Sequence, residues 1–446
     1  MTQHIAKHLP SHRGVAAWNA ILGPQPQAVQ LDSDITADFV VIGAGFAGLS
    51  AARRLSQLQP GARIAVLEAG RIAEGAAGRN SGFMIDLPHD LASDDYASTG
   101  DDRKMIELNR QAIAFAQQAV EDFDIDSDFF DPVGKVNGAA SESAEARNKS
   151  YARHLKTLNE NSEMLDPQQM HEMTGSRHYI SGLYTPGTVM LQPAGYIRGL
   201  AKGLTDDGVQ IFENSAVTRF LREGSTWRVE TQKGAIAAPK LILTVNGHLE
   251  SFGFKKDRLM QLFLFAVMTP VLNSDTLGKL GGQPRWGVTP SDPMGTTMRR
   301  IDTRQGGNRI VTRTCAALRP RMAATPRDMS RAAQVMQRKF DQRFPKLAGI
   351  QMEYQWAGHL CLSLNGVSVT QELENGVYSG CVQNGLGTAR GTLTGIAAAE
   401  SACGHSSEIT RYFSAEPQPK RLPPQPFREI GANLVLRWKE WKASED

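Results

Sequence analysis

An apolar run near the start of the chain leads directly into glycines and then into a helical pattern. Phe39–Ile42 is apolar throughout, and small or apolar side chains recur every three residues along 49–58. The run predicts a buried strand, and the recurrence predicts a helix with one buried face. A Pro-Gly pair ends this helix, and Arg63–Leu67 predicts the strand that follows. Together these segments predict a β-α-β unit.

Patterns farther along the chain predict more helices and strands. Near-helical spacing of apolar residues over 105–123 predicts an amphipathic helix. Apolar runs at 262–271 and 309–313 predict strands, and a strand-like run at 376–382 precedes a helix-like one at 397–402. Because strands and helices mix throughout the chain, the pattern favours an α/β (α+β) fold.

The C-terminal end combines an extended tail with a helix. Residues 416–425 are rich in proline, which predicts an extended strap. The helical pattern at 428–443 includes the apolar residues Ile430, Leu434, Leu436, Trp438 and Trp441. We expect this apolar side to dock on the body of the protein.

Composition excludes several classes of function. The 446 residues include 49 Lys and Arg against 46 Asp and Glu, for a net charge of +3 without a basic block, which argues against a nucleic-acid partner. No apolar run is long enough to predict a transmembrane segment, and the N-terminus lacks a secretion signal core. The four cysteines are scattered and no Cys/His cluster has metal-ligand spacing, so we expect a cytoplasmic location and no metal.

The glycines after the first strand carry the most specific chemistry. Gly43, Gly45 and Gly48 form G-x-G-x-x-G between a predicted strand and a predicted helix. In this context Gly43 permits a tight turn, Gly45 lets the backbone approach a pyrophosphate, and Gly48 lets the helix pack on the strand. Glu68 ends the second strand, where a carboxylate accepts hydrogen bonds from an adenosine ribose. The sequence therefore predicts an adenine dinucleotide.

The residues after Glu68 favour FAD over NAD. They read AGRIAEGAAGRNSGF, a glycine-rich loop with a cation and an amide at Arg79 and Asn80. A nicotinamide domain would normally continue to its next helix at this point, whereas such a loop suits the far half of a longer cofactor. Taken alone, the same loop is also compatible with a surface turn.

These motifs resemble the D-amino-acid-oxidase (DAO) superfamily of FAD enzymes. The resemblance lies in Gly43–Gly48, Glu68 and the loop Gly75–Gly82, which is most similar to that of the γ-glutamylputrescine oxidase branch, beside glycine and sarcosine oxidases. Segments 191–197, 240–247 and 356–394 are similar to later family blocks. The sequence departs from the family pattern where relatives commonly have Gly-His-Gly, because Leu386 replaces the histidine.

The resemblance implies a Rossmann-like FAD-binding domain and a discontinuous substrate-binding domain built on a mixed sheet. We expect residues 1–90, 190–250 and 350–446 to form the first domain, and residues 91–189 and 251–349 to form the second. The predicted FAD-binding residues are Gly43, Ala44, Gly45, Phe46, Ala47, Glu68, Ala69, Gly70, Arg71, Gly78, Arg79, Asn80, Ser81, Gly82, Phe83, Met84, the pair Ala216 and Val217, Gly247, Asn384, Gly385, Leu386, Gly387 and Thr388.

Candidates on the substrate side are fewer, and each has an alternative. Asp86 can hold a substrate ammonium or be a solvated loop residue or helix cap. His359 lies on a strand that passes the flavin in the family, and it can equally be a core histidine. Arg299 and Arg300 stand where some relatives bind a substrate carboxylate, and a strand points only one of them inward. Cys361 lies near a position of covalent attachment in relatives but out of register, so we expect non-covalent FAD.

The implied activity is oxidation of an amine or amino acid by hydride transfer to the flavin, followed by hydrolysis of the imine. The partner is then a small-molecule amine, and oxygen or a carrier accepts the electrons. Alternatives are an FAD-dependent hydroxy-acid dehydrogenase and, with less support, a flavin monooxygenase. A regulatory or structural flavoprotein also remains open.

Overall fold

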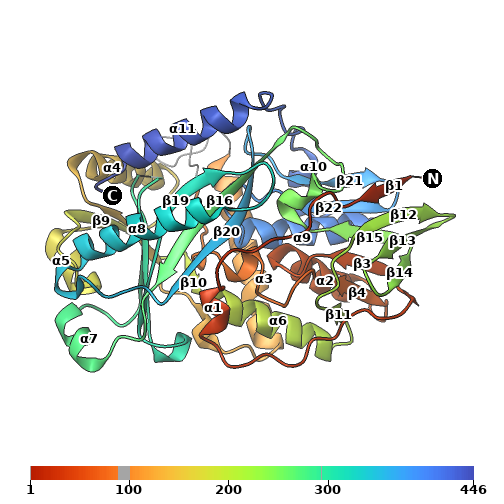
Figure 1. Ribbon diagram of the computed structural model, residues 1–446, viewed down its shortest axis with the longest axis horizontal. Coiled ribbons are helices and arrows are strands. Elements are labelled where there is room, and N and C mark those ends of the chain that lie inside the picture. The colour runs from red at the N-terminus through yellow and green to blue at the C-terminus, as the bar shows by residue number, and fades with distance from the viewer. Residues whose placement is uncertain (1, 89–100, 293) are drawn as a thin grey trace.

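The computed structural model describes residues 2–88, 101–292 and 294–446 (Figure 1). A six-stranded sheet holds the predicted β-α-β unit, with the strand order β11-β4-β3-β15-β22-β21. Its first five strands are parallel, and β21 joins the edge antiparallel. The strands are β3 Phe39–Ile42, β4 Ile64–Leu67, β11 Gln210–Phe212, β15 Lys240–Leu243, β21 Val369–Glu374 and β22 Val377–Cys381.

Helices cover one face of this sheet. Because side chains alternate along a strand, Val41 and Ile242 point into the helical layer, whereas Val40 and Leu241 point to the opposite face. The helical layer consists of α1 Ala17–Ala20, α2 Phe46–Leu58, α3 Asp102–Asp122, α6 Pro193–Asp206, α9 Ala389–Ala402 and α10 Glu408–Ser414.

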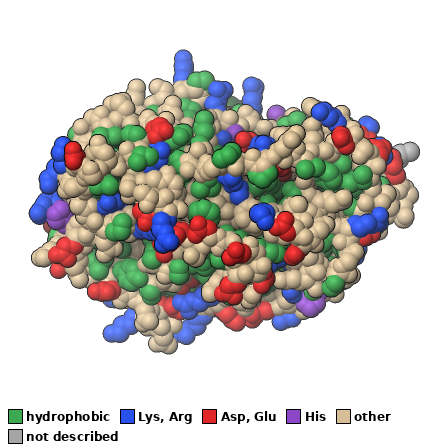
Figure 2. Space-filling model, turned by 90° about the horizontal axis from the view of Figure 1, so that it is seen from below, with side chains coloured by type: hydrophobic (Ala, Val, Ile, Leu, Met, Phe, Trp, Pro, Cys, Tyr) green, Lys and Arg blue, Asp and Glu red, His purple; other side chains and the backbone are tan. Residues whose placement is uncertain are grey.

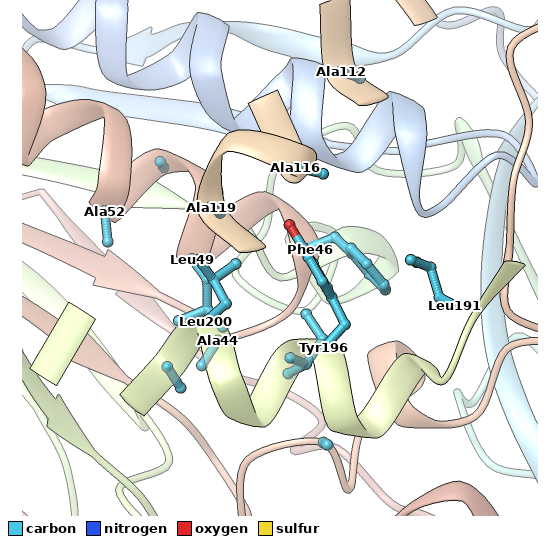
Figure 3. Close-up of a cluster of buried hydrophobic side chains, with 14 of the residues drawn as sticks. Ala44, Phe46, Leu49, Ala52, Ala112, Ala116, Ala119, Leu191, Tyr196 and Leu200 are labelled. Carbon is cyan, nitrogen blue, oxygen red and sulfur yellow. The ribbon is translucent and has the colours of Figure 1, made fainter. Parts of the chain in front are cut away.

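Aromatic stacking and small side chains let these helices approach closely. Phe46 of α2 stacks on Tyr196 of α6 with ring centroids 5.9 Å apart, as Figure 3 shows. Ala112, Ala116 and Ala119 lie along α3 in the same cluster and are fully buried. This packing confirms the predicted amphipathic helix and fixes the start of α2, which borders the site described below.

A small sheet covers the opposite face of the six-stranded sheet. Its apolar side packs Phe220, Trp227 and Ile236 against Val40 and Leu241. The order is β1-β12-β13-β14-β2, with β1 Gln3–Ile5, β2 Ile35–Thr36, β12 Arg219–Glu223, β13 Thr226–Glu230 and β14 Ala235–Ala238. The N-terminal strand β1 thereby ties the first residues of the chain to this sheet.

A second large sheet has eight strands in the order β20-β16-β19-β18-β17-β7-β9-β8. It is mixed, because β17 pairs parallel with β7 and the other pairs are antiparallel. The strands are β7 Lys135–Ala139, β8 Glu163–Leu165, β9 Ser181–Thr185, β16 Leu259–Met268, β17 Trp286–Pro290, β18 Thr297–Ile301, β19 Arg309–Leu318 and β20 Tyr354–Ser363. The domain boundaries stay a prediction. Strand β20 lies within 350–446, the range expected for the FAD-binding domain, but it pairs in this eight-stranded sheet.

Further helices surround the eight-stranded sheet, and a short ribbon joins the two halves. The helices are α4 Glu142–Thr157, α5 Pro167–Thr174, α7 Ser274–Leu280, α8 Pro326–Arg343 and α11 Phe427–Lys442. The ribbon, in the order β5-β10-β6, consists of β5 Phe83–Met84, β10 Val189–Leu191 and β6 Phe130–Asp131. Single 3-10 turns lie at Ala76–Gly78, Ser127–Phe129, Asn246–Leu249, Thr303–Gln305 and Pro345–Leu347.

The C-terminal helix forms as predicted, but its expected docking is wrong. Ile430, Leu434, Trp438 and Trp441 face outward and are 54–72% exposed. The polar side of α11 faces the protein instead, where Asn433 binds both the backbone N–H and the carbonyl of Leu318. Specific polar contacts with β19 therefore set the orientation of this helix.

Candidate active site

The turn between β3 and α2 has no room for side chains. Gly43 has a φ of +106°, in the region that favours glycine. A Cβ on Gly48 would lie 1.8 Å from the Gly43 carbonyl oxygen, so α2 packs on the strand only with glycine there. Among the described residues no side chain caps the N-terminus of α2, which leaves its N–H groups directed at the adjoining cavity.

Thr244 supports this turn from the end of β15. Its hydroxyl donates to the carbonyls of Ile42 and Gly43 at 2.9 and 3.0 Å. The Thr244 hydroxyl lies so close to Gly43 and Gly48 that a Cβ on either residue would crowd it. Thr244 was missed in the sequence analysis; its signal is a hydroxyl residue at the carboxyl end of a parallel strand next to the glycine turn.

Glu68 follows β4 and lies beside the glycine turn, and its contact with an adenosine ribose stays a prediction. Its two carboxylate oxygens accept from Ala44 N at 2.8 Å and from Gly70 N at 3.1 Å. The carboxyl group is recessed in the cavity wall, and this burial raises its pKa despite the hydrogen bonds. Each oxygen keeps a lone pair for a ribose hydroxyl.

One cavity runs from this turn to the eight-stranded sheet. Residues 6 and 8–12 of the N-terminus, Met322 and strands β16, β19 and β20 complete its wall. The predicted cofactor residues in the wall are Gly43, Ala44, Gly45, Phe46, Ala47, Glu68, Ala69, Arg71, Arg79, Asn80, Ser81, Ala216, Val217, Gly385 and Gly387. Within the described part of the chain the others do not line the cavity: Gly70, Gly78, Gly82, Phe83, Met84, Gly247, Asn384, Leu386 and Thr388.

Arg79 joins three segments at the cavity wall. Its guanidinium donates to the carbonyls of Arg13 (3.0 Å), Gly14 (2.9 Å), Glu74 (2.6 Å) and Ala357 (3.2 Å). Burial lowers the pKa of Arg79 to about 10, so it stays charged at neutral pH. The side chain therefore ties the glycine-rich loop to the N-terminal segment and to β20.

A second buried arginine supports the same loop from behind. Arg299 donates to the carbonyls of Leu191 and Gly82, and its guanidinium lies 5.1 Å from the ring of Trp18. Trp18 in turn donates to the Asn80 carbonyl at 2.8 Å. Burial lowers the pKa of Arg299 to about 9. The loop backbone is thus fixed by side chains far away in the sequence.

The C-terminal turn meets this loop. Thr388 donates its hydroxyl to the Phe83 carbonyl at 2.8 Å, and Asn384 accepts from the Ser363 N–H at 2.8 Å. Among the described residues no side chain caps α9, so its N-terminus, like that of α2, presents backbone N–H groups. The start of α2 packs closely on α9: a Cβ on Gly391 would lie 3.2 Å from the Phe46 Cβ, and a Cβ on Gly395, in the middle of α9, would lie 2.1 Å from the Ala47 carbonyl oxygen.

His359 lies in the cavity wall on β20. Its Nε2 is 3.0 Å from the Gln261 amide oxygen, and its ring stacks on Phe263 at 5.0 Å. Burial, with smaller contributions from His248 and His12, lowers the pKa of His359 to about 3. The residue is therefore both packed in the structure, as the alternative interpretation held, and adjacent to the cavity.

Asp86 and Arg300 extend away from the cavity. Asp86 is fully buried, and its Oδ2 accepts from Arg110 at 3.1 Å while its Oδ1 has no hydrogen-bond partner among the described residues. Arg300 donates to the Gly281 carbonyl at 2.6 Å, on the side opposite to Arg299, as the alternation of a strand requires. Neither contributes to the cavity wall among the described residues.

Arg313 is the cation of β19 that faces the cavity, and it was missed in the sequence analysis. It lines the cavity together with Leu264, Phe265 and Ala266 of the neighbouring strand β16. The pattern of 309–313 predicts a strand but does not show which side of the strand faces a cavity. The signal was its alternation with buried Thr312 and Thr314 on an otherwise apolar strand.

These features fit FAD. Two uncapped helix starts suit a pyrophosphate, and the crowded glycine turn leaves backbone rather than side chains at the surface of the site. Cys361 lies in a buried apolar cluster, and burial raises its pKa well above the usual range. Non-covalent attachment stays a prediction. The described residues contain no group of His, Cys, Asp or Glu arranged for a metal, and no helix suited to crossing a membrane.

Comparisons with known proteins agree with this geometry. Residues 38–401 match the family model described as DAO, FAD dependent oxidoreductase. The chain is 24% identical to γ-glutamylputrescine oxidoreductase of Escherichia coli over 417 residues, which cover 90% of this chain and 92% of that protein.

Solved structures share the fold. Glycine oxidase from Geobacillus kaustophilus superposes with a TM-score of 0.69 at 16% identity, covering 87% of this chain and all of that one. L-Amino acid deaminase from Proteus myxofaciens gives 0.67 at 15% identity, covering 91% and 98%. The predicted combination of a Rossmann-like unit with a mixed sheet is confirmed.

Proposed function

Because the chain belongs to the DAO family of FAD-dependent oxidoreductases, we propose that it oxidises the carbon–nitrogen bond of an amino acid or a similar amine that carries an anionic group. Its nature as an FAD-dependent enzyme follows from the family. The relatives named for γ-glutamylputrescine, glycine and L-amino acids support an amine substrate. The observation that carries the proposal is that the glycine turn and Arg313 line one and the same cavity.

The substrate end of the cavity is apolar apart from a few charged and polar groups. Leu264, Phe265 and Met322 exclude water, and Arg313 supplies a positive charge that attracts a substrate carboxylate. FAD, when bound, accepts the two electrons and the hydrogen that leave the substrate carbon. The amine loses a hydride and an N–H proton to become an imine, which water hydrolyses to a carbonyl compound and an amine or ammonia.

The histidines of the cavity wall are weak bases for removing a proton from the substrate ammonium. The pKa values of His12 and His248 are lowered to about 4 and that of His359 to about 3, in each case chiefly by burial. These imidazoles are neutral at pH 7 and are weak bases. We therefore infer that the substrate reacts as the free amine and that kcat/KM rises with pH toward the pKa of that amine.

The test compares amino acids with the matching amines that lack the carboxylate, scored by peroxide formation and by reduction of a dye. Arg313→Met should lower kcat/KM for carboxylate substrates by roughly 10–100-fold, as expected for loss of a charge-assisted hydrogen-bonding pair, and should leave the matching amines unchanged. Arg304→Met, which removes an exposed arginine beside Asp128, is the matched control. An equal loss for both substrate classes would contradict the role of Arg313.

The same panel decides the alternative. A hydroxy acid offers the same carboxylate to Arg313, so turnover of hydroxy acids without turnover of any amine would replace the proposal. Peroxide in the absence of dye would identify oxygen as the acceptor, and activity with dye alone would identify a carrier. Absence of turnover with every compound would favour a regulatory flavoprotein.

A further inference from the structure

The C-terminal helix α11 presents a continuous apolar stripe to the outside. Phe427, Ile430, Leu434, Trp438 and Trp441 recur every three or four residues and are 72, 58, 66, 54 and 72% exposed. Figure 1 shows α11 along the margin of the molecule, outside α8 and β19. A stripe of this size on one helix marks an interaction surface.

Polar contacts on the inner side of α11 hold the helix with its apolar stripe facing outward. On the inner side, Asn433 binds the backbone of Leu318 at 3.1 and 3.2 Å, and Glu440 accepts from Ala316 N at 2.9 Å. Arg437 donates to the Ala316 carbonyl at 3.2 Å. Turning the apolar stripe inward would break each of these bonds, so the helix is held with its hydrophobic side out.

The exposed charges of α11 and of the strap before it are mostly positive. The acidic residues of the helix are neutralised by ion pairs: Glu440 is largely buried against Arg331, and the half-exposed Glu429 pairs with Arg319. The exposed cations of the helix and of the preceding strap are Lys420, Arg421, Lys439 and Lys442. Lys442 lies 5.4 Å over the ring of Trp438, which places an ammonium and an indole together at the edge of the stripe.

We propose that the outer face of α11 docks on an anionic lipid surface. Tryptophan and lysine side by side suit a membrane interface, where the ring enters the boundary and the ammonium meets lipid phosphates. The exposed cations add attraction to negatively charged lipids. A second copy of the chain fits less well, because a two-fold contact along this face would bring its exposed cations close to those of the partner.

The experiment uses the full-length protein with FAD bound and vesicle flotation. Vesicles of phosphatidylglycerol mixed equally with phosphatidylcholine should carry the protein, and phosphatidylcholine vesicles should carry far less. The double variant Trp438→Ser, Trp441→Ser should reduce the bound fraction on anionic vesicles by about tenfold or more. The matched control, Val29→Ser with Leu364→Ser, removes two exposed apolar side chains elsewhere and should bind as the parent does.

Two further results separate the possible occupants. High salt should weaken binding, since the lysine contribution is screened. The proposal is overturned if the parent does not float with anionic vesicles, or if the tryptophan variant and the control float equally. It is also overturned if light scattering shows a dimer that the tryptophan variant dissociates, which would assign the stripe to a second copy.

Discussion

The carboxylate of Glu68 accepts hydrogen bonds from the Ala44 and Gly70 N–H groups and still faces the cavity. Glu68→Ala removes these bonds and those expected to the ribose. We expect a loss of about 1.5–3 kcal/mol in FAD binding, or roughly 10–100-fold in affinity. Fluorescence titration of the apoprotein with FAD measures the change, with the surface variant Glu230→Ala as control. Unaltered affinity in a folded Glu68 variant would refute the ribose assignment.

His359 makes stability depend on pH. Its pKa is about 3 in the folded protein and 6.5 in the unfolded chain. Below pH 6.5 the unfolded chain therefore binds a proton at this imidazole that the folded protein does not bind. Stability is therefore lost as the pH falls from 6.5 toward 3. Between about pH 7.5 and about pH 5.5, this histidine alone should lower the free energy of unfolding by on the order of 1 kcal/mol.

Urea unfolding of the apoprotein at both pH values checks this figure. His359→Gln should lose less stability than the parent over that interval, by on the order of 1 kcal/mol. The exposed His405→Gln is the matched control and should follow the parent. Parallel behaviour of all three proteins would show that the His359 imidazole is accessible to protons in the folded state.

At the scale of elements, the cofactor turn depends on the contact between α2 and α9. A Cβ on Gly395 would lie 2.1 Å from the Ala47 carbonyl oxygen, so Gly395→Ala must push the start of α2 away from the middle of α9. We expect a loss of about 1–3 kcal/mol in stability, together with weaker FAD binding. Gly278→Ala in α7, where nothing lies within 4 Å of the added Cβ, should be neutral or stabilising.

Thermal unfolding with and without FAD measures both effects. If the Gly395 variant is as stable as the Gly278 variant, α9 can shift without a loss of stability. The close packing of α2 on α9 would then not be required for the cofactor turn.

The elements differ in how far the sequence predicts them. The β3-α2-β4 unit was predictable because its signals are local: a strand, a glycine turn and a carboxylate at fixed spacing. The orientation of α11 was not, because it depends on bonds from Asn433 and Glu440 to a strand more than a hundred residues earlier. Hydrophobicity alone predicted the opposite side inward.

The same limit applies to the charged residues of the site. Arg79 and Arg299 donate to backbone carbonyls of distant segments, which the sequence did not predict, and their contacts with cofactor or substrate stay predictions. Arg313 was missed, because its direction depends on the sheet of which β19 is a part. Sequence patterns identify which residues can carry charge, whereas the packing of remote segments decides what each charge contacts.

At the scale of the whole molecule, the cavity lies between two sheets that are joined by the N-terminal segment. This segment pairs with β12 through β1 and lines the cavity at 8–12, and its Arg13 carbonyl accepts a hydrogen bond from the Ala357 N–H on β20. Acidic and basic side chains are interspersed on the face shown in Figure 2, which agrees with a small-molecule rather than a nucleic-acid partner.

The last prediction concerns the source of electrons. The sequence has one G-x-G-x-x-G turn, at Gly43–Gly48, and we expect FAD to occupy it. A flavin monooxygenase needs NADH or NADPH as reductant, which would have to bind without such a turn. We expect neither nucleotide to bleach the FAD absorbance of the anaerobic protein within minutes, whereas a substrate amine should do so. Rapid bleaching by NADPH would instead favour the monooxygenase interpretation, since it would reveal a nicotinamide site that does not depend on the glycine turn.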